Sequence, residues 1–199
     1  LCAVDLGVDQ VKIYKFNDET GKITLVDMLR CELESAPRII KFSPDGRFAY
    51  LICELKNYIS VYSYKDGPRG PVFELVQTIS TLNEYHSKGS AACVLRFSRD
   101  WNYVLCSNAG DNSVGIFKID RETGMLEKIC ILPVSGDYPK AADFFPDNRH
   151  IMALNHESNT MTIFRINYEK KYFSLWGKPL KVETPNCILV SEIEEAPKQ

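Results

Sequence analysis

The sequence has no marked charge imbalance and no long apolar run. Its 199 residues include 24 Lys and Arg against 26 Asp and Glu, which gives a net charge of −2, and residues of the two signs are interspersed along the chain. Such a composition predicts neither a basic surface for nucleic acid nor a polybasic membrane anchor. No apolar run approaches the roughly 18 residues that a transmembrane helix needs. We therefore expect no nucleic-acid partner and no membrane-embedded segment.

Several catalytic and metal-binding motifs are also missing. The sequence contains no GxSxG, HExxH, P-loop or GxGxxG pattern, so serine hydrolases, zinc proteases and nucleotide-binding enzymes are not indicated. The seven cysteines form neither CxxC motifs nor Cys/His pairs, which argues against a disulfide framework and a zinc site. Most lie in apolar runs such as YLICE, where a thiol behaves as a small hydrophobic group. We expect a cytoplasmic protein without a metal or cofactor.

What the sequence does contain is an internal repeat. Four similar segments end in an aromatic residue and recur about every 50 residues, a period typical of the blades of a β-propeller. The segments are Val4 to Tyr14 (VDLGVDQVKIY), Ile52 to Tyr62 (ICELKNYISVY), Ser107 to Phe117 (SNAGDNSVGIF) and Leu154 to Phe164 (LNHESNTMTIF).

One copy, residues 36 to 80, shows the expected blade. Pro37 opens a strand, and the sequence PDGR at 44–47 predicts a turn in which Gly46 takes positive φ. The apolar run 48–53 predicts a strand buried on both faces. Alternation over 58–64, followed by 72–79, completes four strands, here named A to D from the propeller axis outwards. No segment has a helical stripe, so the fold class is all-β.

The ends of the chain do not form whole repeats. Residues 1–35 supply strands B, C and D, and residues 183–190 supply a lone strand A, which together would make one blade. Full blades are predicted at 36–90, 91–138 and 139–182, with an acidic tail at 191–199. Either four blades close on themselves, or the chain is the C-terminal part of a seven-bladed propeller. A start inside strand B, without methionine, favours the second interpretation.

The repeat also predicts which side chains meet. The start of strand A and the end of strand B lie at the same end of the central channel of a propeller. Charged and amide side chains from several blades therefore converge on one face, as an acidic sugar would require. The Asx residues just before strand C instead favour a turn-capping role; they are Asp9, Asn57, Asn112 and Asn159. Asp5, Asn108 and Asn155 could serve either purpose. The converging residues are Arg38, Cys93, Lys140 and Asn186 at the A starts, Asp5, Cys53, Asn108 and Asn155 at the B ends, and Leu6, Glu54, Ala109 and His156 after them.

These strings resemble the lactonase family of seven-bladed β-propellers, which includes propeller-type 6-phosphogluconolactonase and carboxy-cis,cis-muconate cyclase. The matching strings are VDLGVDQVKIYKF (4–16), APRIIKFSPDGRFAYLICEL (36–55), SNAGDNSVGIF (107–117), LNHESNTMTIFRI (154–166) and TPNCILV (184–190). The order of the strings is more specific than any one of them.

The resemblance implies a hydrolase that opens a phosphorylated or carboxylated sugar lactone. Glu54 would be the catalytic base, acting through a water, and Arg38, Lys140, Asp5, Asn108, Asn155 and Arg96 would bind the substrate. Two positions depart from the family: Ile39 stands where a catalytic His is usual, and Ala109 where an Arg is usual. The alternatives are a non-catalytic propeller that binds an acidic sugar or a protein, and a lactonising enzyme like the cyclase. An open propeller edge could also support self-association.

Overall fold

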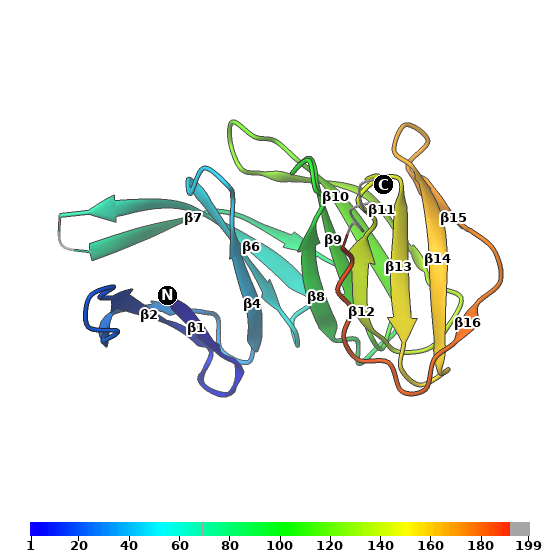
Figure 1. Cartoon of the computed structure of the whole chain (residues 1–199), viewed down its shortest axis with the longest axis horizontal. Helices are drawn as coiled ribbons and strands as arrows, with labels where there is room; N and C mark the ends of the chain where they lie inside the picture. Colours follow the sequence, from blue (N-terminus) through cyan, green and yellow to red (C-terminus); the bar gives the residue numbers. More distant parts are fainter. Residues whose placement is uncertain (69, 192–199) are drawn as a thin grey trace, which may run out of the picture.

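In the computed structural model, which describes residues 1–68 and 70–191, the chain is all-β (Figure 1). Within those residues the helical content is one 3-10 turn, η1 (Leu6–Val8). Four antiparallel sheets follow one another in the chain, and each is a meander of successive strands. This confirms the predicted class and the four blade-equivalents.

The strands of the four sheets are as follows. The first sheet holds β1 (Cys2–Asp5), β2 (Gln10–Phe16) and β3 (Ile23–Arg30). The second holds β4 (Pro37–Phe42), β5 (Phe48–Cys53), β6 (Tyr58–Gly67) and β7 (Gly70–Ser80). The third holds β8 (Ala92–Phe97), β9 (Tyr103–Asn108), β10 (Ser113–Ile119) and β11 (Leu126–Pro133). The fourth holds β12 (Pro139–Phe144), β13 (His150–Asn155), β14 (Thr160–Asn167), β15 (Tyr172–Leu175) and the short β16 (Leu180–Lys181), which pairs with β14.

The hydrophobic core is divided among the gaps between sheets. One apolar cluster joins the first and second sheets around Val11 and Leu51. A second, around Tyr50 and Phe117, joins the second and third sheets, and a third, around Leu105 and Phe164, joins the third and fourth. Strand β5 is buried along its whole length, as a strand covered on both faces should be. Each blade therefore depends on its neighbours for burial of its faces.

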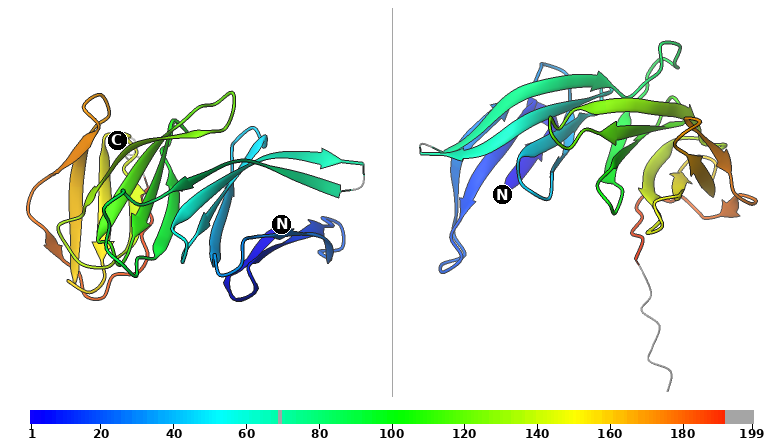
Figure 2. Two further views of the ribbon diagram at one scale, coloured as in Figure 1. Left: turned by 180° about the vertical axis from the view of Figure 1, so that it is seen from behind. Right: turned by 90° about the horizontal axis from the view of Figure 1, so that it is seen from above.

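The sheets fan out along an open arc that does not close into a ring. The first and fourth sheets lie at opposite ends of the arc, with β4, β8 and β12 on its concave side and β7 and β11 on its convex side (Figure 2, right). The concave strands are the predicted A strands, and they line the position of the propeller axis.

The predicted closing strand, 183–190, is not assigned as a strand, and the first sheet has three strands. The segment nevertheless starts as an A strand does. Thr184 has a positive φ of 39°, and its N–H donates to Asn159 Oδ1 at 2.8 Å. Ala36 and Tyr138, which precede β4 and β12, have φ of 53° and 59° and bind Asp9 and Asn112 in the same way. Completion of a blade by this segment stays a prediction, and the predicted acidic tail lies outside the described residues beyond Ser191.

Candidate functional site on the axial face

Each inner strand begins with a β-bulge that the repeat places at the same position. In β4, Pro37 pairs with Cys53 and Ile39 with Ile52, so Arg38 is the extra residue. The same shift leaves Cys93 unpaired in β8 and Lys140 unpaired in β12. A bulge locally redirects the side chain of the extra residue, and bulges are common beside active sites. The three residues predicted at the strand starts are therefore all the extra residue of a bulge, at the same end of the channel.

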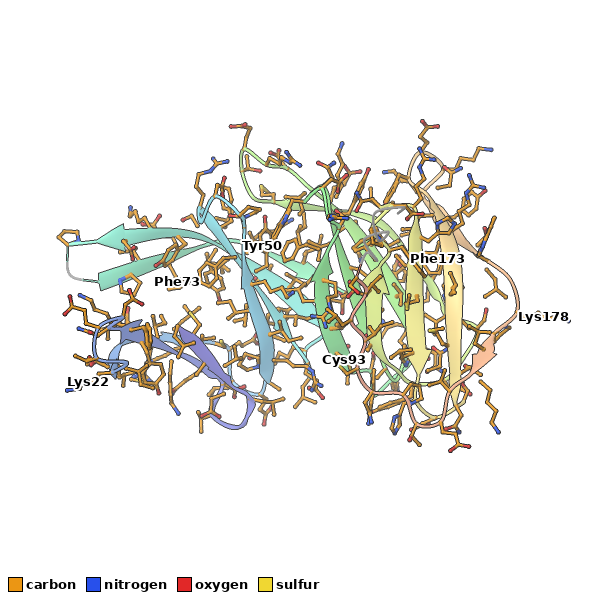
Figure 3. All side chains as sticks on the ribbon, viewed as in Figure 1. Lys22, Tyr50, Phe73, Cys93, Phe173 and Lys178 are labelled. Carbon is orange, nitrogen blue, oxygen red and sulfur yellow. The ribbon has the colours of Figure 1, made fainter. Side chains whose placement is uncertain are left out.

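Arg38 and Glu54 form the centre of this face. The Arg38 Nη1 donates to Glu54 Oε2 at 2.5 Å, and its Nε donates to the backbone carbonyl of Cys93 at 2.8 Å, in the next blade. Glu54 directly follows β5, and its side chain is 21% exposed. Burial raises the pKa of the Cys93 thiol, on which the charges of Arg38, Glu54 and Lys140 also act. The two hydrogen bonds of Arg38 connect the second and third sheets, and Cys93 lies near the lower ends of β4 and β8 in Figure 3.

Lys140 contributes a second cation to the same face. Its side chain is half-buried, and its Nζ lies 5.7 Å from the centroid of the Tyr138 ring. A cation over an aromatic face is held in place without its charge being neutralised. The face thus presents two positive groups and one carboxylate, which suits an anionic ligand that contains an electrophilic carbonyl.

Asp5 has its hydrogen-bond partners within the first sheet and the η1 loop. Its carboxylate accepts a hydrogen bond of 2.8 Å from Lys12 Nζ in the neighbouring strand β2. That bond, together with backbone N–H groups of Gly7 and Val8, holds the pKa of Asp5 below its usual range. The Asp5 side chain therefore fixes the loop that contains η1. Of the two roles predicted for Asp5, this is the structural one.

Asn108 and Asn155 occupy the expected strand ends, but both are fully buried. The Nδ2 of Asn108 donates to the carbonyl of Thr81 at 2.8 Å and to Ser113 Oγ at 3.0 Å. The Nδ2 of Asn155 donates to the hydroxyls of Thr160 and Thr162 at 3.1 Å. Asn155 is thus tied to β14 of its own sheet, and Asn108 is tied both to β10 and to the connection that follows β7 of the second sheet. These contacts give both amides the structural role, and their predicted substrate contact stays a prediction.

Arg96 lies on the inner strand β8, three residues beyond the bulge residue Cys93. Its partner is Asp143 of β12, with Nε and Oδ2 3.5 Å apart. This contact joins the third and fourth sheets, and the predicted contact of Arg96 with a substrate stays a prediction.

The residues before each C strand have the predicted turn role and also join blades. Asp9, Asn57, Asn112 and Asn159 all have φ near +53°, in the left-handed region that Asx side chains tolerate. Asp9, Asn112 and Asn159 accept hydrogen bonds from the backbone at the start of the next inner strand, and Asn57 donates to the carbonyl of Ser90. We call these four residues the interblade clamps.

The two departures from the family pattern also have structural explanations. Ile39 is half-buried and packs against the cluster between the second and third sheets. Ala109 is fully buried, and its N–H donates to the carbonyl of Ala91 at 2.8 Å. His156, at the position equivalent to Ala109, lies with Nδ1 3.3 Å from the carbonyl of Pro185. Neither Ile39 nor Ala109 supplies a group for proton transfer or anion binding.

Lys41 and Asp143 were not predicted from the sequence as charged residues of the inner strands. Both occupy the repeat position of Arg96, one on β4 and the other on β12. A charged residue at the same position in three largely apolar inner strands was the available signal.

The described residues contain no group of three or more His, Cys, Asp or Glu side chains placed to hold a metal ion. All seven cysteines are free thiols. Across the same residues, no helix has the length and apolar character required to cross a membrane.

Comparison with known proteins agrees with this architecture. Residues 1–190 match the family described as lactonase, 7-bladed beta-propeller. A protein of Lactococcus lactis subsp. cremoris is 32% identical over 189 residues, which cover 95% of this chain and 54% of that protein. The 6-phosphogluconolactonase of Bacillus subtilis is 26% identical, with 94% of this chain and 52% of the enzyme covered.

The solved structure of a periplasmic gluconolactonase from Pseudomonas aeruginosa superposes with a TM-score of 0.84 at 25% identity. That match covers 94% of this chain and 52% of the other. The chain thus spans about half the length of the relatives that it matches, in keeping with an open arc that represents part of a propeller. The chain belongs to the lactonase family of seven-bladed β-propellers.

Proposed function

We propose that the Arg38–Glu54 face belongs to the active site of a sugar-lactone hydrolase. The observation that carries the proposal is the Arg38 guanidinium, which links the Glu54 carboxylate to the carbonyl of Cys93 in the next blade. This places a carboxylate and a cation on one axial face, and Lys140 adds a second cation. The Bacillus subtilis relative is named a 6-phosphogluconolactonase, which makes a lactone the first substrate to test.

In the proposed reaction, Glu54 accepts a proton from a water molecule as the water oxygen bonds to the lactone carbonyl carbon. Arg38 or Lys140 stabilises the negative charge that develops on the carbonyl oxygen. The ring C–O bond then breaks, and the proton passes to the departing alkoxide to give the open-chain hydroxy acid. One carboxylate that carries the proton is sufficient for these reaction steps, so no proton-transfer group is needed at the position of Ile39.

The test is the hydrolysis of 6-phosphogluconolactone above its spontaneous rate, measured on the full-length protein that contains this chain. Glu54→Gln should lose about 100-fold or more of the enzymatic rate, in the range of general-base contributions. Glu127→Gln is the matched control because Glu127 is an exposed carboxylate on β11 that pairs with Lys171. No excess rate in the unaltered protein, or an unchanged rate in Glu54→Gln, would reject the proposal.

A non-catalytic function is favoured by one specific observation. Ile39 and Ala109, which occupy the positions of the family's His and Arg, are apolar and packed into the structure. Under this second function the same face binds an acidic sugar without opening it. Binding of 6-phosphogluconate that is weakened by Arg38→Gln, without turnover of the lactone, would support this function.

A further inference from the structure

A cavity of about 470 Å³ lies between the second and third sheets, away from the Arg38–Glu54 face. It is formed by the turns that follow β4, β8 and β10, together with Phe48 and Tyr50 of β5, whereas Arg38 stands at the start of β4. The cavity is therefore at the opposite end of the inner strands. Cavities of this size hold small organic ligands.

Trp101, in the wall of this cavity, has a backbone conformation that tryptophan rarely adopts. Its φ is 56°, and the residues at the same position in the turns after β4 and β12 are Gly46 and Asn148, with φ of 70° and 55°. Glycine and asparagine tolerate the left-handed region, whereas a bulky residue there is strained, and such strain is common at ligand sites. The turn does not need tryptophan, so the ring has a role beyond forming the turn.

The Trp101 ring is held in place from behind. It stacks on Phe97 with the ring centroids 4.3 Å apart, and Phe97 in turn packs edge-on against Tyr50 at 5.2 Å. Trp101 is nevertheless only half-buried, and it borders the cavity. Stacking of this kind fixes the orientation of the ring, so the cavity has a rigid aromatic surface on one side.

Hydrogen bonds between the turns fix the other walls. The Arg47 Nη2 donates to the carbonyl of Arg121 at 2.8 Å, and the Arg121 Nη2 donates to the carbonyl of Asp100. The hydroxyl of Tyr50 donates to the carbonyl of Gly124 at 3.0 Å. The three turns are thus joined to one another, and a ligand would not need to order them on binding.

The equivalent gap between the third and fourth sheets is filled by a side chain. Tyr168 occupies the repeat position of Arg121, and its ring stacks on Tyr103 with the centroids 3.8 Å apart. Its hydroxyl donates to the carbonyl of Asn148 at 2.6 Å. An aromatic residue at this position therefore closes the gap between two blades, whereas Arg121 leaves the cavity.

The polar groups of the cavity suit a ligand that both donates and accepts hydrogen bonds. A guanidinium has five N–H donors, and the hydrogen bonds within the protein use two in Arg47 and one in Arg121. Glu122 adds a carboxylate, which only accepts. With Asp45 and Asp100, the lining has two positive and three negative side chains, so it has no excess of cations for an anionic ligand. Hydroxyl groups donate and accept, and a sugar ring has a C–H face that packs on an aromatic surface.

We propose that this cavity binds a neutral sugar, with the C–H face of the sugar ring on Trp101 and its hydroxyl groups at Arg121 and Glu122. The site is separate from the axial face. Binding there requires neither Arg38 nor Glu54 and does not depend on lactone hydrolysis.

The experiment is saturation-transfer NMR on the full-length protein with the neutral disaccharides maltose, cellobiose, lactose and sucrose. At least one should bind, and Trp101→Asn should weaken its binding about tenfold because the aromatic surface is lost. Trp176→Asn is the matched control, since Trp176 is 54% exposed and follows β15 in the fourth sheet, and it should leave binding unchanged. No binding of any disaccharide, or equal effects of the two variants, would overturn the proposal.

Urea denaturation separates binding from a structural role of Trp101. Trp101→Asn removes the contact with Phe97 but relieves the strain at positive φ, as Asn148 indicates, so the two effects oppose each other and the urea midpoint should change little. Lost binding together with a large fall in the midpoint would show that Trp101 acts through folding, which counts against the site.

A second variant reaches the cavity without altering Trp101. Arg121→Tyr introduces the residue of the equivalent gap and should abolish sugar binding without lowering the urea midpoint. Unchanged binding in this variant would place the sugar elsewhere. Tetramethylammonium tests the other ligand that an aromatic ring beside carboxylates attracts. If it binds and the disaccharides do not, the cavity is a site for organic cations and the sugar proposal fails.

Discussion

Two sets of equivalent positions behave differently from blade to blade. The interblade clamps Asp9, Asn57, Asn112 and Asn159 are chemically similar in all four copies, and their φ values lie within about one degree of each other. The bulge residues Arg38, Cys93 and Lys140 share a backbone conformation but differ in chemistry. Positions that every blade needs carry similar residues, whereas the bulge positions on the axial face differ, as the residues of one asymmetric site would under the proposed function.

The variety of side chains at the bulge positions points to binding as their role. The β-bulge recurs in three blades, but the side chain at its extra residue differs each time. A turn or a cap would require the same residue type each time, so local stability alone does not explain these side chains. The bulges bring different side chains to one face, and a small asymmetric ligand requires such variety. The comparison therefore predicts that the clamps govern stability and the bulge residues govern binding.

The largest expected effect on stability is at a clamp. Asn112→Ala removes the hydrogen bond that Asn112 Oδ1 accepts from Tyr138 N at 2.8 Å, and it places a Cβ-bearing residue without a polar side chain at φ +53°. Together these changes should lower the free energy of unfolding by about 2 kcal/mol. Urea denaturation followed by circular dichroism measures the change.

Asn112→Gly distinguishes the two causes. Glycine adopts the same φ without strain but cannot make the side-chain hydrogen bond. It should therefore cost about 1 kcal/mol, roughly half the effect of alanine. If the two variants lose equal stability, backbone strain contributes nothing at this position.

At the axial face the effect on stability should be smaller. Arg38→Gln removes an ion pair whose side chains are 40% and 21% exposed, and such pairs contribute about 1 kcal/mol or less. The same variant should reduce lactone hydrolysis or sugar binding at least tenfold, because a charge-assisted contact to the ligand is lost. Parallel urea denaturation and kinetic measurements test the contrast. A stability loss as large as that of Asn112→Ala would show that Arg38 is mainly structural.

Local patterns were sufficient to predict the strands and turns. Apolar residues 48–53 predicted a strand buried on both faces, and β5 has those bounds. The PDGR turn was expected to place Gly46 at positive φ, and its φ is 70°. These predictions succeeded because a turn and a fully buried strand are determined by residues close together in the chain.

The remaining features depend on neighbours that the sequence does not identify. The bulge at Arg38 appears only when β4 is paired with β5, since one residue of shift changes which side chain is unpaired. Two roles were open for Asn108 in the sequence, and the partner of its amide, the carbonyl of Thr81, lies 27 residues earlier in the chain. Lys41, Arg96 and Asp143 come from three different sheets, and no single repeat shows that their charges act on one another.

The smallest effect concerns acid stability and tests whether a third repeated set behaves like the clamps. Asp45, Asp100 and Asp147 occupy the turns between strands A and B. The hydroxyl of Ser43 donates to Asp45 at 2.6 Å and Arg47 Nε donates at 2.6 Å, and these bonds hold the pKa of Asp45 far below its usual range. Asp100 and Asp147 also have lowered pKa values, with hydrogen bonds from their own turns.

A carboxyl group whose pKa is lower in the folded than in the unfolded state stabilises the fold when it is ionised. That contribution is complete above the unfolded pKa of about 3.9 and is lost as the pH falls towards the folded value. The protein and Asp45→Asn should therefore differ in urea midpoint at pH 6 and converge towards pH 2. Glu19→Gln, at an exposed carboxylate, should show no such convergence. A constant difference between Asp45→Asn and the protein from pH 6 to pH 2 would mean that the turn needs the shape of aspartate and not its charge.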